Sequence, residues 1–164
     1  METSLDIKTP ELYELIKAES LLSWIRVRSA NLLAVDGRDW ISKFSYDHSG
    51  TYANQWMIID FTKFEEENEG GNILNPGFLS VIEEMPGMIR SGDETQKLLV
   101  RLNLLFVVCL LPQSQGYWAS YNEPYFTELA DYSGNTDYCE ATRLEYAASH
   151  GTHPCHFYHF TTSL

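Results

Sequence analysis

The chain has 164 residues, of which 44% are hydrophobic and 13% aromatic, and it carries a net charge of −12. This composition excludes an intrinsically disordered chain and is sufficient for one domain with a buried core. The excess of acidic residues argues against a nucleic-acid partner and against docking on anionic membranes, because no basic patch is present to neutralise phosphates.

Three helices are predicted in the first 45 residues. The first is expected over 10–17, because Thr9 and Pro10 are typical of a helix start. A longer helix should begin at Ser20 and end before Gly37, with a single stripe formed by Leu21, Ile25, Arg28 and Leu32. A short helix should then cover 39–45.

The next stretch predicts a polar bend that leads into a buried strand. Gly50 and its hydroxylic neighbours are typical of a turn, and the apolar run 56–59 that follows ends at Asp60. Asn54 and Gln55 lie where the bend becomes a strand. A carboxamide at this place can donate a hydrogen bond to a developing oxyanion, or it can simply fix its own turn. Trp24 and Trp40 are interpreted as core aromatics.

A hairpin is predicted further along the chain. The acidic run 65–69 is interpreted as a solvated loop and not as a cation site. Strands over 78–84 and 88–90, joined by Pro86 and Gly87, should then pack beside the strand of Trp56. A short helical stretch is expected from Gly92 to about Leu99.

The segment 100–115 reads as an insertion. Its apolar run, 104–111, is too short for a transmembrane helix, so no membrane span is expected. Two explanations stay open, a retained intron and a buried strand particular to this protein. The aromatic loop 116–126 that follows could line an acyl-chain pocket or pack in the core. A helix is expected over 136–148.

The C-terminal part and the N-terminus give few functional signals. Cysteine occurs at three positions without a pairing pattern, namely Cys109, Cys139 and Cys155. The His-rich tail 150–159 could suggest zinc, but Gly151 and Pro154 would break a helix that aligned its ligands, so no metal or cofactor is expected. The residues at Met1 do not form a signal-peptide pattern.

Four blocks of the sequence resemble the phospholipase B-like family. Residues 49–60 match Ser-Gly-Thr-Tyr-Asn-Asn-Gln-Trp-Met, two aliphatic residues and Asp, with Ala53 in place of the first Asn. The segment 20–37 is similar to the family's preceding block. Residues 83–88 resemble Glu-Gln-Ile-Pro-Gly-Met, and 116–126 resemble a Tyr-Trp-Ala-Ser-Tyr-Asn block.

The resemblance implies an α+β fold, specifically part of an αββα N-terminal-nucleophile hydrolase sandwich over 1–138, followed by a divergent tail over 139–164. It implies a hydrolase that cleaves lipid ester or amide bonds through an N-terminal Cys, in a secreted or lysosomal protein. None of the three cysteines matches that nucleophile. We therefore expect an interior segment of a larger enzyme, inactive without the missing N-terminal portion, which would be its partner together with a lipid substrate.

The resemblance also implies site residues. Asn54 is the candidate oxyanion or pocket donor, and the candidate substrate-binding residues are Trp56, Tyr117 and Trp118. His48 matches no family role and is interpreted as structural. Two other hypotheses stay open, a non-catalytic binding or subunit-like half-domain, and a metal-binding module built on the His-rich tail.

Overall fold

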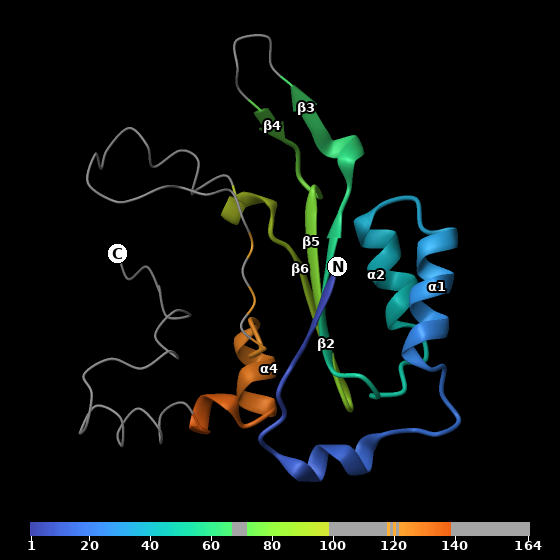
Figure 1. Ribbon diagram of the computed structural model, residues 1–164, viewed down its shortest axis with the longest axis vertical. Helices are drawn as coiled ribbons and strands as arrows, with labels where there is room; N and C mark the ends of the chain where they lie inside the picture. Colours follow the sequence, from blue (N-terminus) through green and yellow to red (C-terminus); the bar gives the residue numbers. More distant parts are fainter. Residues whose placement is uncertain (67–71, 99–117, 119, 121, 139–164) are drawn as a thin grey trace, which may run out of the picture.

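A four-stranded antiparallel sheet forms the centre of the computed structural model, which describes residues 1–66, 72–98, 118, 120 and 122–138. The strand order is β1-β2-β5-β6. The strands are β1 (Glu2–Ser4), β2 (Asn54–Ile59), β5 (Leu79–Met85) and β6 (Met88–Asp93). Helices lie on both sides of this sheet (Figure 1). The expected α+β class is therefore confirmed.

The predicted hairpin is confirmed as the pair β5 and β6. Gly87, at its turn, has a φ of +80°, a conformation that glycine adopts without strain. Strand β5 pairs with β2 on its other side, so the hairpin lies beside the strand of Trp56 as expected. Every residue of β5 is buried, because elements cover both faces of the sheet.

Helices α1 (Ser23–Leu33) and α2 (Gly37–Ser45) form a layer on one face of the sheet (Figure 1). The Asp36 side chain accepts a hydrogen bond from the Asp39 amide at 2.7 Å and so caps α2. Trp40 and Phe44, one turn apart on α2, stack with their ring centroids 4.8 Å apart and pack against Ile82 of β5. The short helix expected over 39–45 is confirmed.

The opposite side of the sheet carries helix α4 (Thr127–Tyr132), which the sequence analysis did not predict. Its buried side chain Leu129 packs with Leu5 and Met85. Because α4 has only six residues, it is too short to produce a recognisable 3.6-residue periodicity. Residues 136–138 are helical, as expected for the start of the predicted helix 136–148, whose remainder lies outside the described residues.

Several predictions about local structure were wrong. The helix predicted over 10–17 is a shorter 3-10 helix, η1 (Pro10–Leu15). Helix α1 begins at Ser23, and its buried residues are Ser23, Arg26 and Ala30 instead of the predicted apolar stripe. Trp40 is a core residue, but Trp24 is 67% exposed. The physical reason is that α1 turns Arg26 inward to reach a buried carboxylate on β5.

Part of the acidic run differs from the expected loop, because Glu65 and Glu66 lie in a strand, where both are exposed, while 67–69 lie outside the described residues. Strands β3 (Phe64–Glu66) and β4 (Asn72–Leu74) pair there as a separate two-stranded sheet, preceded by the 3-10 helix η2 (Phe61–Lys63). Residues 95–98 are helical, as expected, but the predicted start at Gly92 is wrong, because Gly92 and Asp93 form the end of β6. The segment 100–115, the cysteines and the His-rich tail lie outside the described residues.

Candidate functional site

The bend before β2 is built from glycine geometry and short hydroxyl contacts. Gly50 has a φ of +78°, and a Cβ added there would lie 2.7 Å from Pro86 Cα, so the bend approaches the β5–β6 turn at backbone contact. The Ser49 and Thr51 hydroxyls are 2.7 Å apart. The bend is therefore held against the end of β5, and the first residues of β2 follow directly from it.

The two carboxamides at the start of β2 point to opposite faces of the sheet. Strand side chains alternate, and residues opposite one another on paired strands share a face. Asn54 is opposite Glu84 and therefore lies on the face covered by α1 and α2. Gln55 is opposite Glu83 and lies on the face of α4. Each carboxamide thus shares its face with a buried carboxyl group.

On the helix side, Glu84 forms a buried ion pair with Arg26. Arg26 Nη2 is 2.8 Å from Glu84 Oε2, and the two side chains are 1% and 0% exposed. The same guanidinium donates to the carbonyls of Leu21 and Phe44 and to the Ser23 hydroxyl. Ser23 Oγ donates to the Thr51 carbonyl at 2.8 Å. This network joins α1, α2, β5 and the bend.

On the opposite face, Glu83 accepts three hydrogen bonds. The donors are Gln55 Nε2 at 2.7 Å and the backbone amides of Tyr125 and Phe126 at 2.7 and 3.1 Å. Trp118 Nε1 donates to Gln55 Oε1 at 2.8 Å. The structure therefore brings Trp118, from the aromatic loop, against the bend carboxamide, although 63 residues separate them in the chain.

Burial controls the protonation of both carboxyl groups. Loss of solvation raises the pKa of Glu83 to about 7, opposed by the hydrogen bonds from Gln55 and Phe126. Burial also raises the pKa of Glu84 to about 7, opposed by the charge of Arg26. Two adjacent carboxyls therefore titrate near neutral pH. Perturbed pKa values of this kind are common at functional sites and also occur in structural networks.

The structure places the predicted site residues in different surroundings. Within the described residues, both amide atoms of Asn54 are buried without a hydrogen-bond partner. An unpaired buried polar group costs about 1–3 kcal/mol, so Asn54 is held in an unfavourable environment. Trp56 is half-buried between the sheet and α1. Tyr117 lies outside the described residues.

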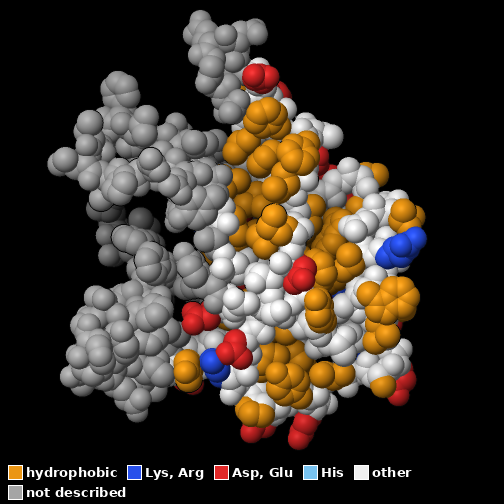
Figure 2. All heavy atoms as spheres, viewed as in Figure 1, with side chains coloured by type: hydrophobic (Ala, Val, Ile, Leu, Met, Phe, Trp, Pro, Cys, Tyr) orange, Lys and Arg blue, Asp and Glu red, His pale blue; other side chains and the backbone are white. Residues whose placement is uncertain are grey.

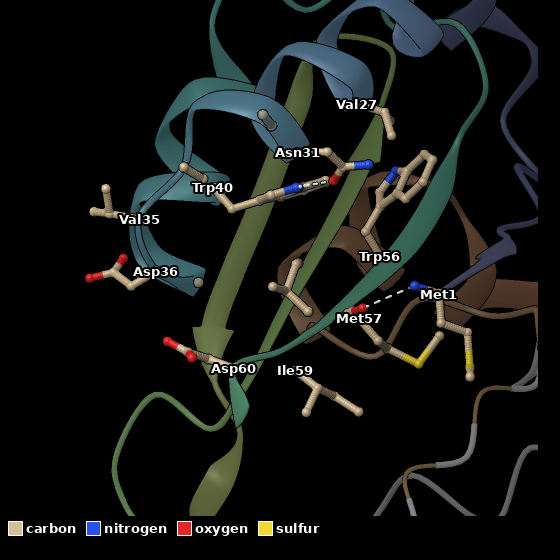
Figure 3. Close-up of a pocket in the computed structure, with 14 residues that line it drawn as sticks. Met1, Val27, Asn31, Val35, Asp36, Trp40, Trp56, Met57, Ile59 and Asp60 are labelled. Carbon is tan, nitrogen blue, oxygen red and sulfur yellow. Dashed lines mark hydrogen bonds between the residues drawn. The ribbon is translucent and has the colours of Figure 1, made fainter. Parts of the chain in front are cut away.

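Two open grooves meet at Trp56. The first, of about 420 Å³, lies between α1, α2 and β2; in it Trp40 donates a hydrogen bond to Asn31 at 2.7 Å (Figure 3). The second, of about 900 Å³, lies between α1 and the bend at Tyr52. Asn54 and Gln55 line neither of these grooves.

His48 is half-buried in the segment that leads to the bend. Burial, followed by the charges of Arg26 and Lys17, lowers the pKa of His48. In residues 1–66, 72–98 and 122–138, together with 118 and 120, no cluster of three or more His, Cys, Asp or Glu side chains could hold a metal ion. The described helices also include none with the length and apolar character needed to cross a bilayer.

With this geometry in view, comparison with known proteins identifies the family. The family model for phospholipase B matches residues 1–153. The chain belongs to the phospholipase B family. It is 37% identical over 138 residues to phospholipase B-like protein D of Dictyostelium discoideum, covering 84% of this chain and 21% of that protein.

Other phospholipase B relatives show similar coverage. Phospholipase B-like protein B of Dictyostelium discoideum is 40% identical over 137 residues, covering 84% of this chain and 21% of the relative. Phospholipase B of Crotalus adamanteus is 32% identical over 147 residues, covering 90% and 23%. The chain therefore spans about a fifth of the length of the curated relatives that it matches.

Sequence reasoning did not identify the central residues of the two networks. Arg26 was assigned to no role, and the pair Glu83 and Glu84 was used only as part of a phospholipase B-like motif. The available signal was the position of two carboxylates inside an apolar strand, Leu79–Met85, since a buried acid requires a donor or a cation.

Proposed function

We propose that this chain forms one wall of the active site of a phospholipase B-like N-terminal-nucleophile hydrolase that cleaves lipid ester or amide bonds. The family membership supports a lipid hydrolase. The αββα sandwich, the secreted or lysosomal location and the thiol mechanism are proposed from the resemblance of residues 49–60, 83–88 and 116–126. The four-stranded sheet with a helical layer on one face is compatible with half of such a sandwich.

In the proposed reaction a Cys thiol attacks the carbonyl carbon of the lipid. Its proton passes to the free α-amine of the same Cys and then to the departing alcohol or amine, which leaves an acyl thioester that water hydrolyses. The carbonyl oxygen becomes negatively charged during each attack. A preorganised amide N–H that has no other partner is suited to stabilise this charge, because no existing hydrogen bond has to be broken.

One observation carries this proposal: the buried carboxamide of Asn54, with both polar atoms unpaired within the described residues. The bend that precedes it is fixed by Ser23 and Arg26, so the amide is held by a rigid network. Asn54 does not line either groove at Trp56, so in this proposal the lipid carbonyl reaches its amide only in the longer protein, which carries the nucleophile. The isolated chain is then inactive.

A chimera tests the proposal. Residues of this chain would replace the matching 138-residue segment of phospholipase B-like protein D of Dictyostelium discoideum. Hydrolysis of a phosphatidylcholine would be measured for the chimera, for its Asn54→Ala variant and for the isolated chain. We expect the Asn54→Ala change to lower kcat by about 100-fold or more with little effect on KM, as for loss of an oxyanion donor.

The matched control is Asn75→Ala, which removes a carboxamide bonded to the exposed Glu65. This variant should hydrolyse lipid like the parent chimera. Hydrolysis by the isolated chain would contradict the proposed need for a separate nucleophile. Full activity of the Asn54→Ala chimera would remove Asn54 from the site.

A further inference from the structure

Helix α1 exposes large apolar side chains and buries two polar ones, which departs from the usual pattern of a surface helix. Ser23 and Arg26 are buried, whereas Trp24 is 67% and Leu32 is 73% exposed. The outer side of α1 is thus suited to contact an apolar body. Figure 2 shows several hydrophobic side chains at the right of the view, in the region of α1, with a basic side chain among them.

This apolar side is one wall of the groove of about 900 Å³ between α1 and the bend. Apolar side chains dominate its lining, among them Leu22, Trp24, Leu32, Tyr52 and Trp56. Ser23 and Thr51 add polar groups at the side of the bend. A concave, mostly apolar site of this volume with few polar groups is typical of small-molecule binding sites, whereas a flat patch is typical of protein contacts.

The groove also carries a positive charge that the described residues do not neutralise. Arg28 lines it, is exposed, and forms no hydrogen bond or ion pair within the described part of the chain. It lies one turn from both Trp24 and Leu32 on the same face of α1. The sequence of α1 contains two arginines and no carboxylate, although the whole chain has a net charge of −12.

We propose that this groove binds a long-chain fatty acid, with the acyl chain along Trp24, Leu32 and Trp56 and the carboxylate on Arg28. The lining supplies an apolar surface for the acyl chain, and the positive charge of Arg28 complements the carboxylate of the fatty acid. The inference does not depend on the proposed hydrolase activity. The main ligand of its test is the free acid, which has no hydrolysable bond, so either proposal can fail alone.

The test is a titration of the chain with 9,10-dibromostearate below its aggregation concentration, followed by quenching of tryptophan fluorescence. Bromine quenches a nearby indole, and Trp24 and Trp56 both line the groove. We expect saturable quenching at one site. Arg28→Gln should weaken binding about fivefold. The methyl ester of the same acid, which has no charge, should bind equally to the wild-type chain and to this variant.

Two further variants separate groove binding from general hydrophobic adsorption. Leu32→Gln, inside the groove, should weaken binding of both ligands about tenfold. Leu33→Gln is the matched control, because Leu33 is 63% exposed on the same helix and does not line the groove. It should bind like the wild-type chain. Thermal melts would verify that each variant is folded. If Leu32→Gln is unfolded, the comparison of Arg28→Gln with the wild-type chain tests the proposal on its own.

Three results would overturn the proposal. The first is binding that Arg28→Gln leaves unchanged for the acid. The second is an equal loss in Leu33→Gln and Leu32→Gln. The third is a dimer in size-exclusion chromatography with light scattering that Leu32→Gln dissociates, since a second copy would then occupy this face.

Discussion

Replacing Arg26 by Met tests the central network most directly. Arg26 is the counter-ion of Glu84, which is fully buried, and its side chain also donates to the carbonyls of Leu21 and Phe44. Methionine keeps much of the volume of the side chain but provides no charge and no donor. The carboxyl of Glu84 and both carbonyls are then left inside the protein without this partner.

Arg26→Met should lower the free energy of unfolding of the protein. Breaking a buried ion pair on one side typically costs about 3–5 kcal/mol, because the other charge remains desolvated. For a chain of this size, about 1 kcal/mol corresponds to roughly 2–4 °C in Tm, so Arg26→Met should lower Tm by about 6–20 °C. Thermal and urea unfolding followed by far-UV circular dichroism would measure this change.

The double variant Arg26→Met with Glu84→Leu provides the control. It removes both charges, so it should recover about 2 kcal/mol or more relative to Arg26→Met alone. A loss below about 1 kcal/mol in the single variant would refute the reasoning. A double variant no more stable than the single one would show that the pair is not the source of the loss.

Three other predictions concern the same region. Glu83 has its pKa raised to about 7 from 4.5, so the folded state binds this proton more tightly than the unfolded state, and its contribution to stability falls by about 3 kcal/mol as pH rises from about 4.5 to 7. In urea titrations at several pH values, Glu83→Gln should remove this contribution and leave the similar one of Glu84, so the pH dependence should become weaker but persist. Asn54→Leu removes two unpaired buried polar atoms and should raise stability by about 1–3 kcal/mol in a thermal melt, and a loss of similar size would mean that the amide has a partner. Gly50→Ala should lower the free energy of unfolding more than Gly77→Ala does, because both glycines have a positive φ but, of the two, only Gly50 approaches another backbone atom, Pro86 Cα. Equal losses of stability in the two variants would contradict a steric role for Gly50.

The sequence predicted elements whose signals are local. The hairpin turn at Pro86 and Gly87, and the short helix with Trp40 and Phe44 one turn apart, follow from turn chemistry and helical spacing alone. The face of α1 could not be predicted in this way. Its orientation depends on Glu84, 58 residues further along the chain, and periodicity cannot report such a distant charge.

The candidate site was predictable only in part. Asn54 and Gln55 were singled out at the strand entrance, and Trp118 was singled out independently in the aromatic loop. That Trp118 would bond to Gln55 and not to Asn54 depends on sheet alternation and on the register between β2 and β5. Neither is visible until the strands are paired.

The adjacent pair Glu83 and Glu84 also bears on how β5 finds its alignment. A shift of the β5 register by one residue would exchange the two faces of the strand. Because every residue of β5 is buried, both faces are covered, and hydrophobic burial alone would not oppose this shift. The two acids face unlike surroundings, a guanidinium on one side and backbone amides on the other. A slip in one direction would place Met85 at the guanidinium, and a slip in the other would place Ile82 at the backbone amides, so either slip leaves one of the two partners without an acid. The two acids therefore select a single register for β5, which hydrophobic burial alone would leave undetermined.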